Sequence, residues 1–246
     1  KYSPTIPLSA LRFLIAFAVT HSCTITTLDV AGAYLFAKLE PDDEIYLRVP
    51  PRMHDVVDFL DEDGKPAEFI KLTRYLYGLQ RAGAAFYRHF RDWLLSIGFT
   101  QCKSEPCLFV HVDGHERILV GCYVDDDVIV SNSSRLSAWY RQEFAKAFME
   151  SPDSTGDAED HDFLGLHIHH DRSKRVATLG APRLIDKLVA VVGVPTAPVL
   201  TPVIPAHVER LELAPSDANP VVPESEFSCR AVLGLVLWIV LACRPD

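Results

Sequence analysis

Three consecutive aspartates, Asp125, Asp126 and Asp127, stand between two apolar runs in the stretch CYVDDDVIVSNS. Adjacent like charges repel one another, and apolar neighbours make an ionised carboxylate more costly. A solvated turn would explain the aspartates, but it does not need Tyr-Val before it and Val-Ile-Val after it. These neighbours predict carboxylates at the tip of a buried hairpin, where a metal ion is the natural neutralising partner.

A further aspartate, Asp29, ends the apolar stretch TITTLDV. Neighbouring strands lie about 4.8 Å apart, so Asp29 could share ions with Asp125 and Asp126 if their strands were adjacent. Two carboxylate-bound ions about 3.5–4 Å apart are typical of in-line phosphoryl transfer. Oxygen ligands without clustered His or Cys favour Mg²⁺ or Mn²⁺ over zinc. An EF-hand is excluded, because Val130 and Leu136 occupy the positions that would need Gly and Glu.

The surrounding sequence predicts the elements that must position these carboxylates. β-Branched and alternating patterns predict strands over residues 23–30, 44–49, 107–112, 118–124, 128–130 and 163–170. Asp113-Gly114 is a strong hairpin signal between two of these strands. Apolar residues at helical spacing predict one helix that begins near Pro7. They predict four more over residues 84–97, 134–150, 182–192 and 231–243. Strands in hairpins with helices on one face define an α+β layer.

Composition narrows the class of protein. The chain is 48% hydrophobic and 23% charged, as in globular proteins, and its formal net charge of −9 argues against a surface that is basic throughout. Residues 65–91 form a local exception in which six cations alternate with aromatic residues. Such a stretch predicts a nucleic-acid track, and its alternative is an amphipathic helix with a solvated basic face. The cations are Lys65, Lys71, Arg74, Arg81, Arg88 and Arg91.

The remaining features concern compartment and boundaries. The six cysteines contain no CxxC pair, which favours buried reduced thiols over a disulfide framework or a zinc site. The apolar runs over residues 8–19 and 231–243 are both shorter than the roughly 20 residues that a bilayer requires. We therefore expect no membrane association and no secretion. Seven prolines between residues 195 and 223 predict an extended linker over residues 194–226. We expect the chain to be a piece of a longer protein.

The motif YVDD, residues 123–126, resembles the signature of reverse transcriptases, and its surroundings resemble the copia-type (Pseudoviridae) retrotransposon branch. TLDVAGAYL resembles that family's first acidic motif, and LYGLQRAGAAFY resembles its LYGLKQAPRAWY block. FLGL resembles the primer-grip strand, and the segment ending in CRPD resembles the block ending in TRPD. These blocks keep the family's order across nearly the whole chain.

The resemblance implies an RNA-directed DNA polymerase that adds dNTPs to a primer on an RNA or DNA template. Its fold would be an α+β polymerase palm-like antiparallel sheet with helices packed on one face, plus partial fingers and a C-terminal helical segment. Residues 1–193 would form the palm with partial fingers, 194–226 the linker, and 227–246 the start of the connection or thumb. Implied partners are a primer–template and adjoining integrase and RNase H segments, in a cytoplasmic retrotransposon particle or in the nucleus.

The resemblance also implies roles for individual residues. Asp29, Asp125 and Asp126 would hold two Mg²⁺ or Mn²⁺ ions and make up the catalytic cluster. Tyr34 would stack under the incoming sugar and exclude a 2′-hydroxyl, and the nucleotide-binding set would be Tyr34, Tyr77, Gly78 and Arg81. The nucleic-acid-binding set would be Tyr123, Lys71, Arg74, Arg88, Phe163, Leu164 and Gly165.

Several residues depart from the family pattern. Gly83 replaces Pro, Glu150 stands where Lys is common, and Asp127 occupies a position that is usually apolar. These departures favour an alternative, a decayed or domesticated copy that keeps the fold and binds nucleic acid without catalysis. The intact Asp29, Asp125 and Asp126 oppose that alternative. A third possibility, a Mg²⁺-dependent phosphohydrolase, is opposed by Tyr34 and the ordered blocks.

Overall fold

The computed structural model describes residues 3–53, 56–61, 63–192 and 229–243. The chain divides into two compact units, Lys1–Phe163 with His169–Ala177, and Leu164–Ile168 with Thr178–Asp246. The predicted linker over residues 194–226 lies outside the described residues.

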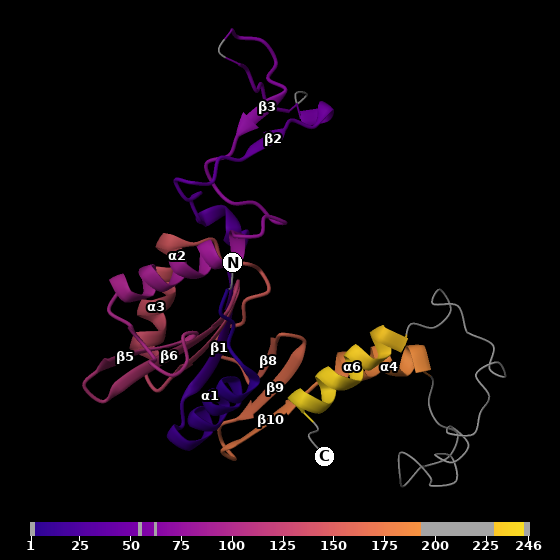
Figure 1. Cartoon of the computed structure of the whole chain (residues 1–246). Coiled ribbons are helices and arrows are strands. Elements are labelled where there is room, and N and C mark those ends of the chain that lie inside the picture. The colour runs from indigo at the N-terminus through magenta and orange to yellow at the C-terminus, as the bar shows by residue number, and fades with distance from the viewer. Residues whose placement is uncertain (1–2, 54–55, 62, 193–228, 244–246) are drawn as a thin grey trace, which may run out of the picture. The chain divides into compact units, whose positions relative to one another are not determined.

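A five-stranded antiparallel sheet forms the centre of the first unit (Figure 1). Its strand order is β1-β7-β6-β5-β4, so that β1 and β7, about a hundred residues apart in sequence, are neighbours. The strands are β1 (Thr24–Asp29), β4 (Thr100–Gln101), β5 (Leu108–Asp113), β6 (Glu116–Tyr123) and β7 (Asp126–Ser131). The predicted α+β class with an antiparallel sheet is therefore confirmed.

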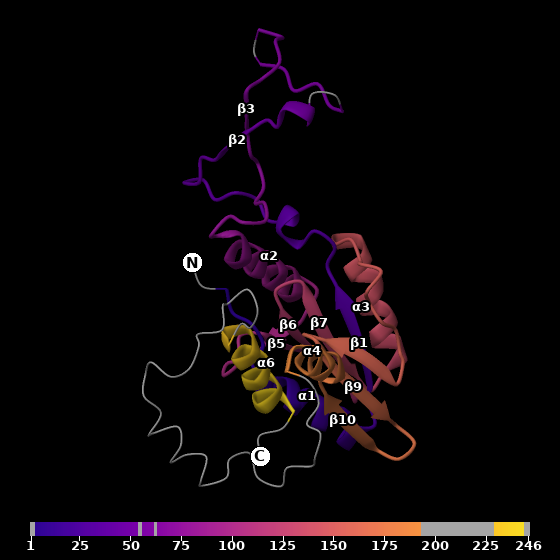
Figure 2. The same cartoon turned by 90° about the vertical axis from the view of Figure 1, so that its right-hand side faces the viewer.

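Helices occupy both faces of this sheet. Helix α1 (Leu8–His21) covers one face, because a Cβ added at Gly121 would lie only 2.7 Å from Cδ1 of Leu14. Helices α2 (Ala82–Ser96) and α3 (Ser134–Ala147) flank the sheet on the other side (Figure 2). An aromatic cluster joins these two helices, with ring contacts among Trp93, Tyr140, Phe144 and Phe148. The expected packing of helices on one face therefore holds for α2 and α3, whereas α1 covers the opposite face.

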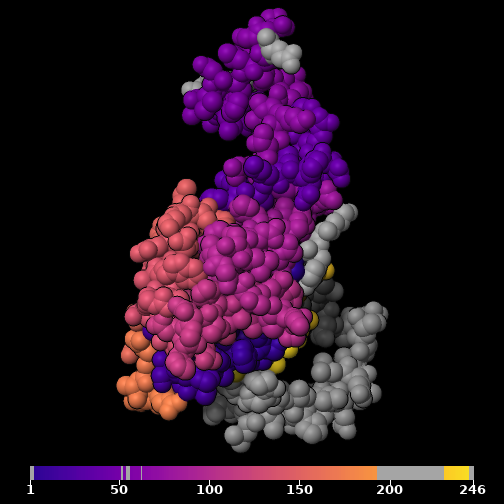
Figure 3. Space-filling view, turned by 90° about the vertical axis from the view of Figure 1, so that its left-hand side faces the viewer, coloured from indigo at the N-terminus to yellow at the C-terminus, as the bar shows by residue number. Residues whose placement is uncertain are grey.

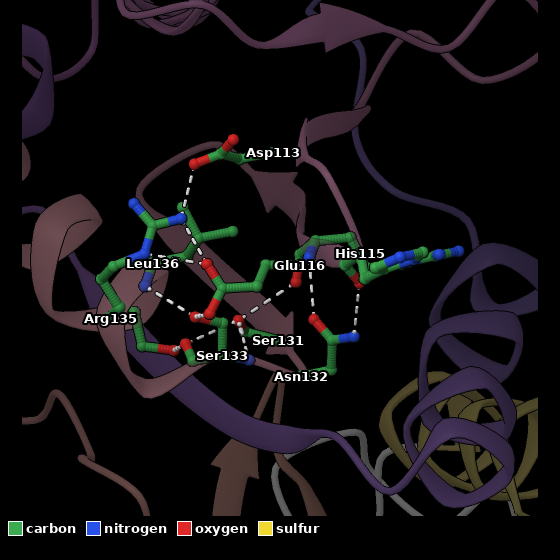
Figure 4. A network of polar contacts seen from close by, with 10 residues as sticks. Asp113, His115, Glu116, Ser131, Asn132, Ser133, Arg135 and Leu136 are labelled. Atoms are coloured by element: carbon green, nitrogen blue, oxygen red, sulfur yellow. Dashed lines mark hydrogen bonds and ion pairs between the residues drawn. The ribbon is translucent and has the colours of Figure 1, made fainter.

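The hairpin of β5 and β6 is tied to the start of α3 by a polar network (Figure 4). Arg135 forms ion pairs with Asp113 and Glu116, the two residues that close the hairpin loop. Ser133 Oγ donates to Glu116 over 2.7 Å and accepts from the amide of Leu136 over 3.1 Å, which caps the helix. The predicted hairpin turn is confirmed.

A small ribbon in the same unit projects beyond α2 (Figures 1 and 3). It consists of β2 (Tyr46–Arg48) paired with β3 (Phe69–Lys71), beside the short 3₁₀ helix η2 (Pro51–Met53). Another 3₁₀ helix, η1 (Ala33–Phe36), connects β1 to this ribbon.

The sequence predicted one continuous strand over residues 163–170, which begins with FLGL. This prediction is wrong, because the chain turns within FLGL. Strand β8 (Asp160–Phe163) ends there and β9 (Leu166–Asp171) begins, in a sheet of order β10-β9-β8 with β10 (Val176–Gly180). Leu164 and Gly165 both have positive φ, 55° and 76°, so they reverse the chain. The apolar pattern of FLGL suits a strand, and only the backbone conformation reveals the turn.

The second unit contains α4 (Pro182–Val192) and α6 (Cys229–Ala242), which contact each other. No helix in the described part of the chain combines the length and apolarity needed to cross a bilayer. The thiols of Cys23, Cys107 and Cys122 are free and buried, as expected, whereas Cys102 and Cys243 are partly exposed.

Candidate active site

The pairing of β1 with β7 brings the two distant acidic segments together. Asp29 is directly opposite Asp126 in the antiparallel register, and the amide of Val30 donates to the carbonyl oxygen of Asp125 over 2.9 Å. Tyr123 is opposite Asp126 on the other neighbouring strand, β6. Because directly paired residues share a face of the sheet, Asp29, Asp126 and Tyr123 project from one face at the end of three strands.

A two-residue loop, Val124-Asp125, joins β6 to β7 and forms the two central residues of the YVDD motif. Val124 has a φ of 60°, a left-handed conformation that a β-branched residue rarely adopts. Such backbone strain costs about 1–3 kcal/mol and persists only where the surrounding structure imposes it. The loop that presents Asp125 is therefore held in an unfavourable conformation by the strands on either side.

Burial, together with the neighbouring negative charges, raises the pKa of both Asp125 and Asp126. Burial raises the pKa of Asp126 to about 6, and the negative charges of Asp125, Asp29 and Asp153 contribute to the rise. The pKa of Asp125 is also raised, first by burial and then by Asp29. A divalent cation placed among these groups would reverse both shifts, because it favours the ionised form.

Asp127 points to the opposite face of the sheet and is 1% exposed. Neither of its carboxylate oxygens has a hydrogen-bond partner in the described structure, and nor has the buried hydroxyl of Tyr140. Burial, followed by the charge of Asp126, raises the pKa of Asp127 well above its ordinary value. Asp127 therefore belongs to the core beneath α3 and not to the acidic cluster on the other face.

Two tyrosines lie beside the acidic cluster. The rings of Tyr34, from η1, and Tyr77 have centroids 4.5 Å apart and are tilted by 52°. Burial raises the pKa of each tyrosine, and the charge of Asp125 raises both further. The structure thus brings Tyr34 and Tyr77 together with Asp125.

The segment after α3 supports β1 from its other edge, which the sequence did not reveal. Ser154 Oγ accepts from the amide of Asp29 over 3.0 Å, and the amide of Ser151 donates to the Asp29 carbonyl over 2.9 Å. Thr155 bonds to the ring of buried His161, with 2.7 Å between Oγ1 and Nδ1. Hydrogen bonds from this segment therefore fix the backbone that carries Asp29, and no local sequence pattern signals these partners.

The basic stretch is less available than its composition suggested, because an acidic segment faces it. Lys71 pairs with Glu44 at 2.8 Å, Arg81 pairs with Asp43 at 2.7 Å, and Arg88 pairs with Glu40. In the same stretch, Gly78 follows Tyr77 and has a positive φ of 92°, a backbone conformation that favours glycine. Arg74 instead donates to the carbonyl oxygens of Leu35 and Phe36 over 3.0 and 3.1 Å.

The three residues of the FLGL turn are placed differently from one another. The side chain of Phe163 is buried, Leu164 is partly exposed, and Gly165 is exposed. They belong to different units, Phe163 to the first and the other two to the second.

The donor chemistry of the cluster fits a divalent cation. Asp29, Asp125 and Asp126 offer hard oxygen donors, which Mg²⁺ and Mn²⁺ prefer, and their mutual repulsion is what a cation would relieve. Within the described residues, no three His, Cys, Asp or Glu side chains converge closely enough to hold a metal ion. The carboxylates are thus gathered at one strand end without forming a closed ligand set.

Comparison with known proteins defines the class. A family model described as reverse transcriptase (RNA-dependent DNA polymerase) matches residues 1–205. The chain belongs to this reverse transcriptase family.

Its relatives confirm the copia-type resemblance. The chain is 35% identical over its whole length to a retrovirus-related Pol polyprotein from transposon RE1 of Arabidopsis thaliana, of which it spans 15%. Over 67% of the chain it is 34% identical to the transposon RE2 polyprotein of the same plant, and it covers 10% of that protein. It is 25% identical over its whole length to the polyprotein of transposon TNT 1-94 from Nicotiana tabacum, of which it covers 18%.

The chain therefore spans less than a fifth of each of these three relatives. Among solved structures, a telomerase from Candida albicans in complex with a telomeric RNA fragment matches with a TM-score of 0.40 and 11% identity. That match covers 68% of this chain and 33% of the telomerase chain.

Proposed function

We propose that the chain is the polymerase-bearing part of a copia-type Pol polyprotein and catalyses RNA-directed DNA synthesis. The observation that carries this proposal is the direct pairing of Asp29 with Asp126 beside Asp125. A carboxylate cluster on one face of a sheet, flanked by two tyrosines, suits nucleotidyl transfer from a dNTP to a primer.

In this mechanism Asp29, Asp125 and Asp126 would hold two Mg²⁺ or Mn²⁺ ions. The ions would lower the barrier by activating the attacking oxygen and by stabilising charge on the leaving group. The protein's own contribution is to position the carboxylates and to keep the primer end and the nucleotide in line. Tyr123, which shares the face of Asp126, would contact the primer strand.

Tyr34 would discriminate between sugars, with its ring lying against that of Tyr77. Replacing Tyr34 by Ala should admit ribonucleotides, whereas Tyr34→Phe should keep the discrimination, because the ring and not the hydroxyl excludes a 2′-oxygen. Primer extension with matched dNTP and NTP series measures this ratio. Unchanged sugar discrimination in Tyr34→Ala would contradict the role.

The wider proposal assigns residues 1–193 to a palm with partial fingers and residues 227–246 to the start of the following region. Gly78 and Arg81 would complete the nucleotide side, and Lys71, Arg74, Arg88, Phe163, Leu164 and Gly165 the nucleic-acid side. Because Lys71, Arg81 and Arg88 are ion-paired, a primer–template or dNTP would have to displace Glu44, Asp43 and Glu40. Integrase and RNase H segments would adjoin the chain, in a cytoplasmic particle or in the nucleus.

The decisive test extends an oligo(dT) primer on a poly(rA) template, using protein that includes the flanking polyprotein segments. Asp125→Asn should reduce the rate at least about a hundredfold, since a lost metal ligand removes several kcal/mol of charge stabilisation. Asp113→Asn, at the loop of the neighbouring hairpin, is the matched control and should retain extension. Equal extension by wild type and Asp125→Asn would sink the polymerase proposal.

A second candidate, a copy that binds nucleic acid without catalysis, is favoured by Glu150. This residue stands where the family commonly has Lys, and it forms an ion pair with Arg141. Salt-dependent binding of primer–template without any extension, with either Mg²⁺ or Mn²⁺, would select this candidate.

A further inference from the structure

Strand β1 is the outermost strand of the central sheet, so the backbone groups on its free edge need partners from outside that sheet. The segment between α3 and β8 supplies them. On one side of Asp29, the amide of Ala31 donates to the carbonyl oxygen of Met149 over 2.8 Å. On the other side, Thr27 and Thr155 exchange two backbone hydrogen bonds of 3.3 and 3.0 Å. The segment therefore lies along the edge on both sides of Asp29.

The pairing is irregular opposite Asp29 itself. Both backbone polar groups of Asp29 point to the free edge, because Val30 is the residue that bonds to the Asp125 carbonyl oxygen. The carbonyl oxygen of Asp29 accepts from the amide of Ser151 over 2.9 Å. Beyond Ser151 the segment bulges, because it advances four residues before it pairs again while β1 advances two. The amide of Asp29 donates to Ser154 Oγ over 3.0 Å, so a side chain takes the place of a backbone acceptor.

A chain of hydrogen bonds holds this bulge in place. Thr27 Oγ1 and Thr155 Oγ1 are 2.6 Å apart, and Thr155 Oγ1 lies 2.7 Å from Nδ1 of His161. Nε2 of the same ring lies 2.9 Å from the carbonyl oxygen of Ala158, which can only accept. Because burial lowers the pKa of His161, the ring is neutral at pH 7, with its proton on Nε2 and with Nδ1 accepting from Thr155. The residue next to Ser154 is therefore fixed from both sides.

The bulge also reaches the acidic cluster. The negative charge of Asp153, the residue before Ser154, contributes to the raised pKa of Asp126. Asp29 is paired with Asp126 across the two strands, so a shift of the Asp29 backbone changes the separation of their carboxylates. A displacement of the bulge would therefore act on Asp29 through its backbone and on Asp126 through charge.

From these contacts we infer that Ser154 is a positioning residue for the acidic cluster. By accepting from the amide of Asp29, its hydroxyl holds the Asp29 carboxylate where it can share ions with Asp125 and Asp126. The inference rests on the proposed metal-binding role of these aspartates, and Ser154 itself contacts only the backbone of a ligand. Ser154 is partly exposed, so water can replace its hydroxyl at the amide when the side chain is shortened. Removing the hydroxyl should therefore weaken metal binding without unfolding the protein.

The first measurement is the Mg²⁺ dependence of primer extension, with oligo(dT) on poly(rA) and protein that includes the flanking polyprotein segments. Ser154→Ala should raise the Mg²⁺ concentration at half-maximal rate about tenfold, a loss typical of removing a group that orients a metal ligand. At saturating Mg²⁺ the rate should return close to that of wild type, because the bound ions then hold the carboxylates. A purely structural defect would persist at saturation.

The second measurement is Mn²⁺ binding without primer or dNTP, followed by the electron paramagnetic resonance signal of the free ion. Ser154→Ala should bind Mn²⁺ about tenfold more weakly, and Ser154→Thr, which keeps the hydroxyl, should restore the affinity. Ser137→Ala is the matched control, because it removes a hydroxyl that donates to the carbonyl oxygen of Ser133 over 3.0 Å, within α3 and its cap. This control should leave both measurements unchanged, and melting temperatures verify that every variant folds.

Failure of the inference and failure of the proposed function give different results. Wild-type protein that binds Mn²⁺ but extends no primer would contradict the polymerase proposal, and the Mn²⁺ titrations would still decide the role of Ser154. Equal Mn²⁺ affinity in Ser154→Ala and Ser137→Ala would overturn that role and leave the polymerase proposal intact. A rate loss in Ser154→Ala that persists at saturating Mg²⁺, or that Ser154→Thr does not restore, would also overturn it. Wild-type protein that binds no Mn²⁺ would overturn both.

Discussion

Two consecutive hairpins of the central sheet share a design and differ in what they hold. Each has a two-residue loop whose first residue has positive φ, Gly114 at 62° in one and Val124 at 60° in the other. In the first hairpin, Arg135 neutralises both Asp113 and Glu116 beside the loop (Figure 4). The second hairpin carries three aspartates, and among the described residues no cation forms an ion pair with any of them.

The difference separates a structural turn from a functional one. In the first hairpin, glycine adopts the left-handed conformation without strain, and Arg135 neutralises the two carboxylates. This turn therefore needs no ligand to be stable. The second keeps a strained valine and mutually repelling carboxylates, each of which costs stability. Local rules that are broken together at one place are typical of a functional site, where a ligand supplies what the fold lacks.

The largest expected effect is on catalysis, when the equivalent carboxylates of the two hairpins are neutralised. Asp126 and Glu116 each begin the strand that follows a loop. Asp126→Asn should lower primer extension at least about a hundredfold, because it removes a proposed metal ligand, whereas Glu116→Gln should change it about twofold or less. A similar loss in both variants, measured as extension rate per folded protein, would mean that the second hairpin is not special.

The next largest effect is on stability, through Asp127. Asp127→Val should raise the free energy of unfolding by about 1–3 kcal/mol at neutral pH, since it removes a buried carboxyl group that lacks hydrogen-bond partners. Asp113→Val, the control in the first hairpin, should not stabilise, because it removes a partner of Arg135.

The gain from Asp127→Val should depend on pH in a defined direction. The pKa of Asp127 is raised in the folded protein, so its carboxyl group favours folding below its unfolded pKa of about 3.9 and opposes it increasingly as pH rises. Urea titrations at several pH values in EDTA should show a larger gain at high pH than at pH 4. A gain that is constant with pH would mean that Asp127 has an ordinary pKa.

Sequence reasoning succeeded where the signals are local and failed where partners are distant. Asp113-Gly114 predicted its hairpin, and the apolar approach to Asp29 indicated a strand that could meet the YVDD motif. The pairing of Glu40, Asp43 and Glu44 with the basic stretch was not foreseen, because loops of irregular length separate the partners.

Backbone conformation explains the other failures. The side-chain pattern alone predicts that Leu164 is a strand residue, yet its φ is positive. A β-branched residue such as Val124 also suits a strand, so the sequence gives no sign of its left-handed conformation. The bond between His161 and Thr155 could not be predicted either, because it depends on how the segment after α3 folds back beside β1. The pairing of Asp29 with the YVDD segment could therefore be predicted, whereas the hydrogen bonds that support the backbone of Asp29 could not.

A reciprocal exchange of the loop residues tests the strain directly. Val124→Gly should stabilise the protein by about 1 kcal/mol, since relief of left-handed strain exceeds the entropic cost of glycine. Gly114→Val should destabilise by about 1–2 kcal/mol through strain alone, because an added Cβ would meet nothing within 4 Å. Denaturant unfolding measures both, and a loss of stability in Val124→Gly would show that valine is not strained there.

The smallest effect concerns the charge network of the first hairpin, and its pH dependence should be opposite to that of Asp127. Hydrogen bonds from Ser133 and Arg135 lower the pKa of Glu116, so this group stabilises the fold above its unfolded pKa of about 4.3 and loses that effect as pH falls. Glu116→Gln should therefore lower the melting temperature slightly at pH 7 and converge with wild type near pH 3. The difference should shrink in high salt, because the ion pair with Arg135 is exposed. If the difference grew as the pH fell, the two hairpins would respond to pH alike, and the contrast between a neutralised turn and a charged one would fail.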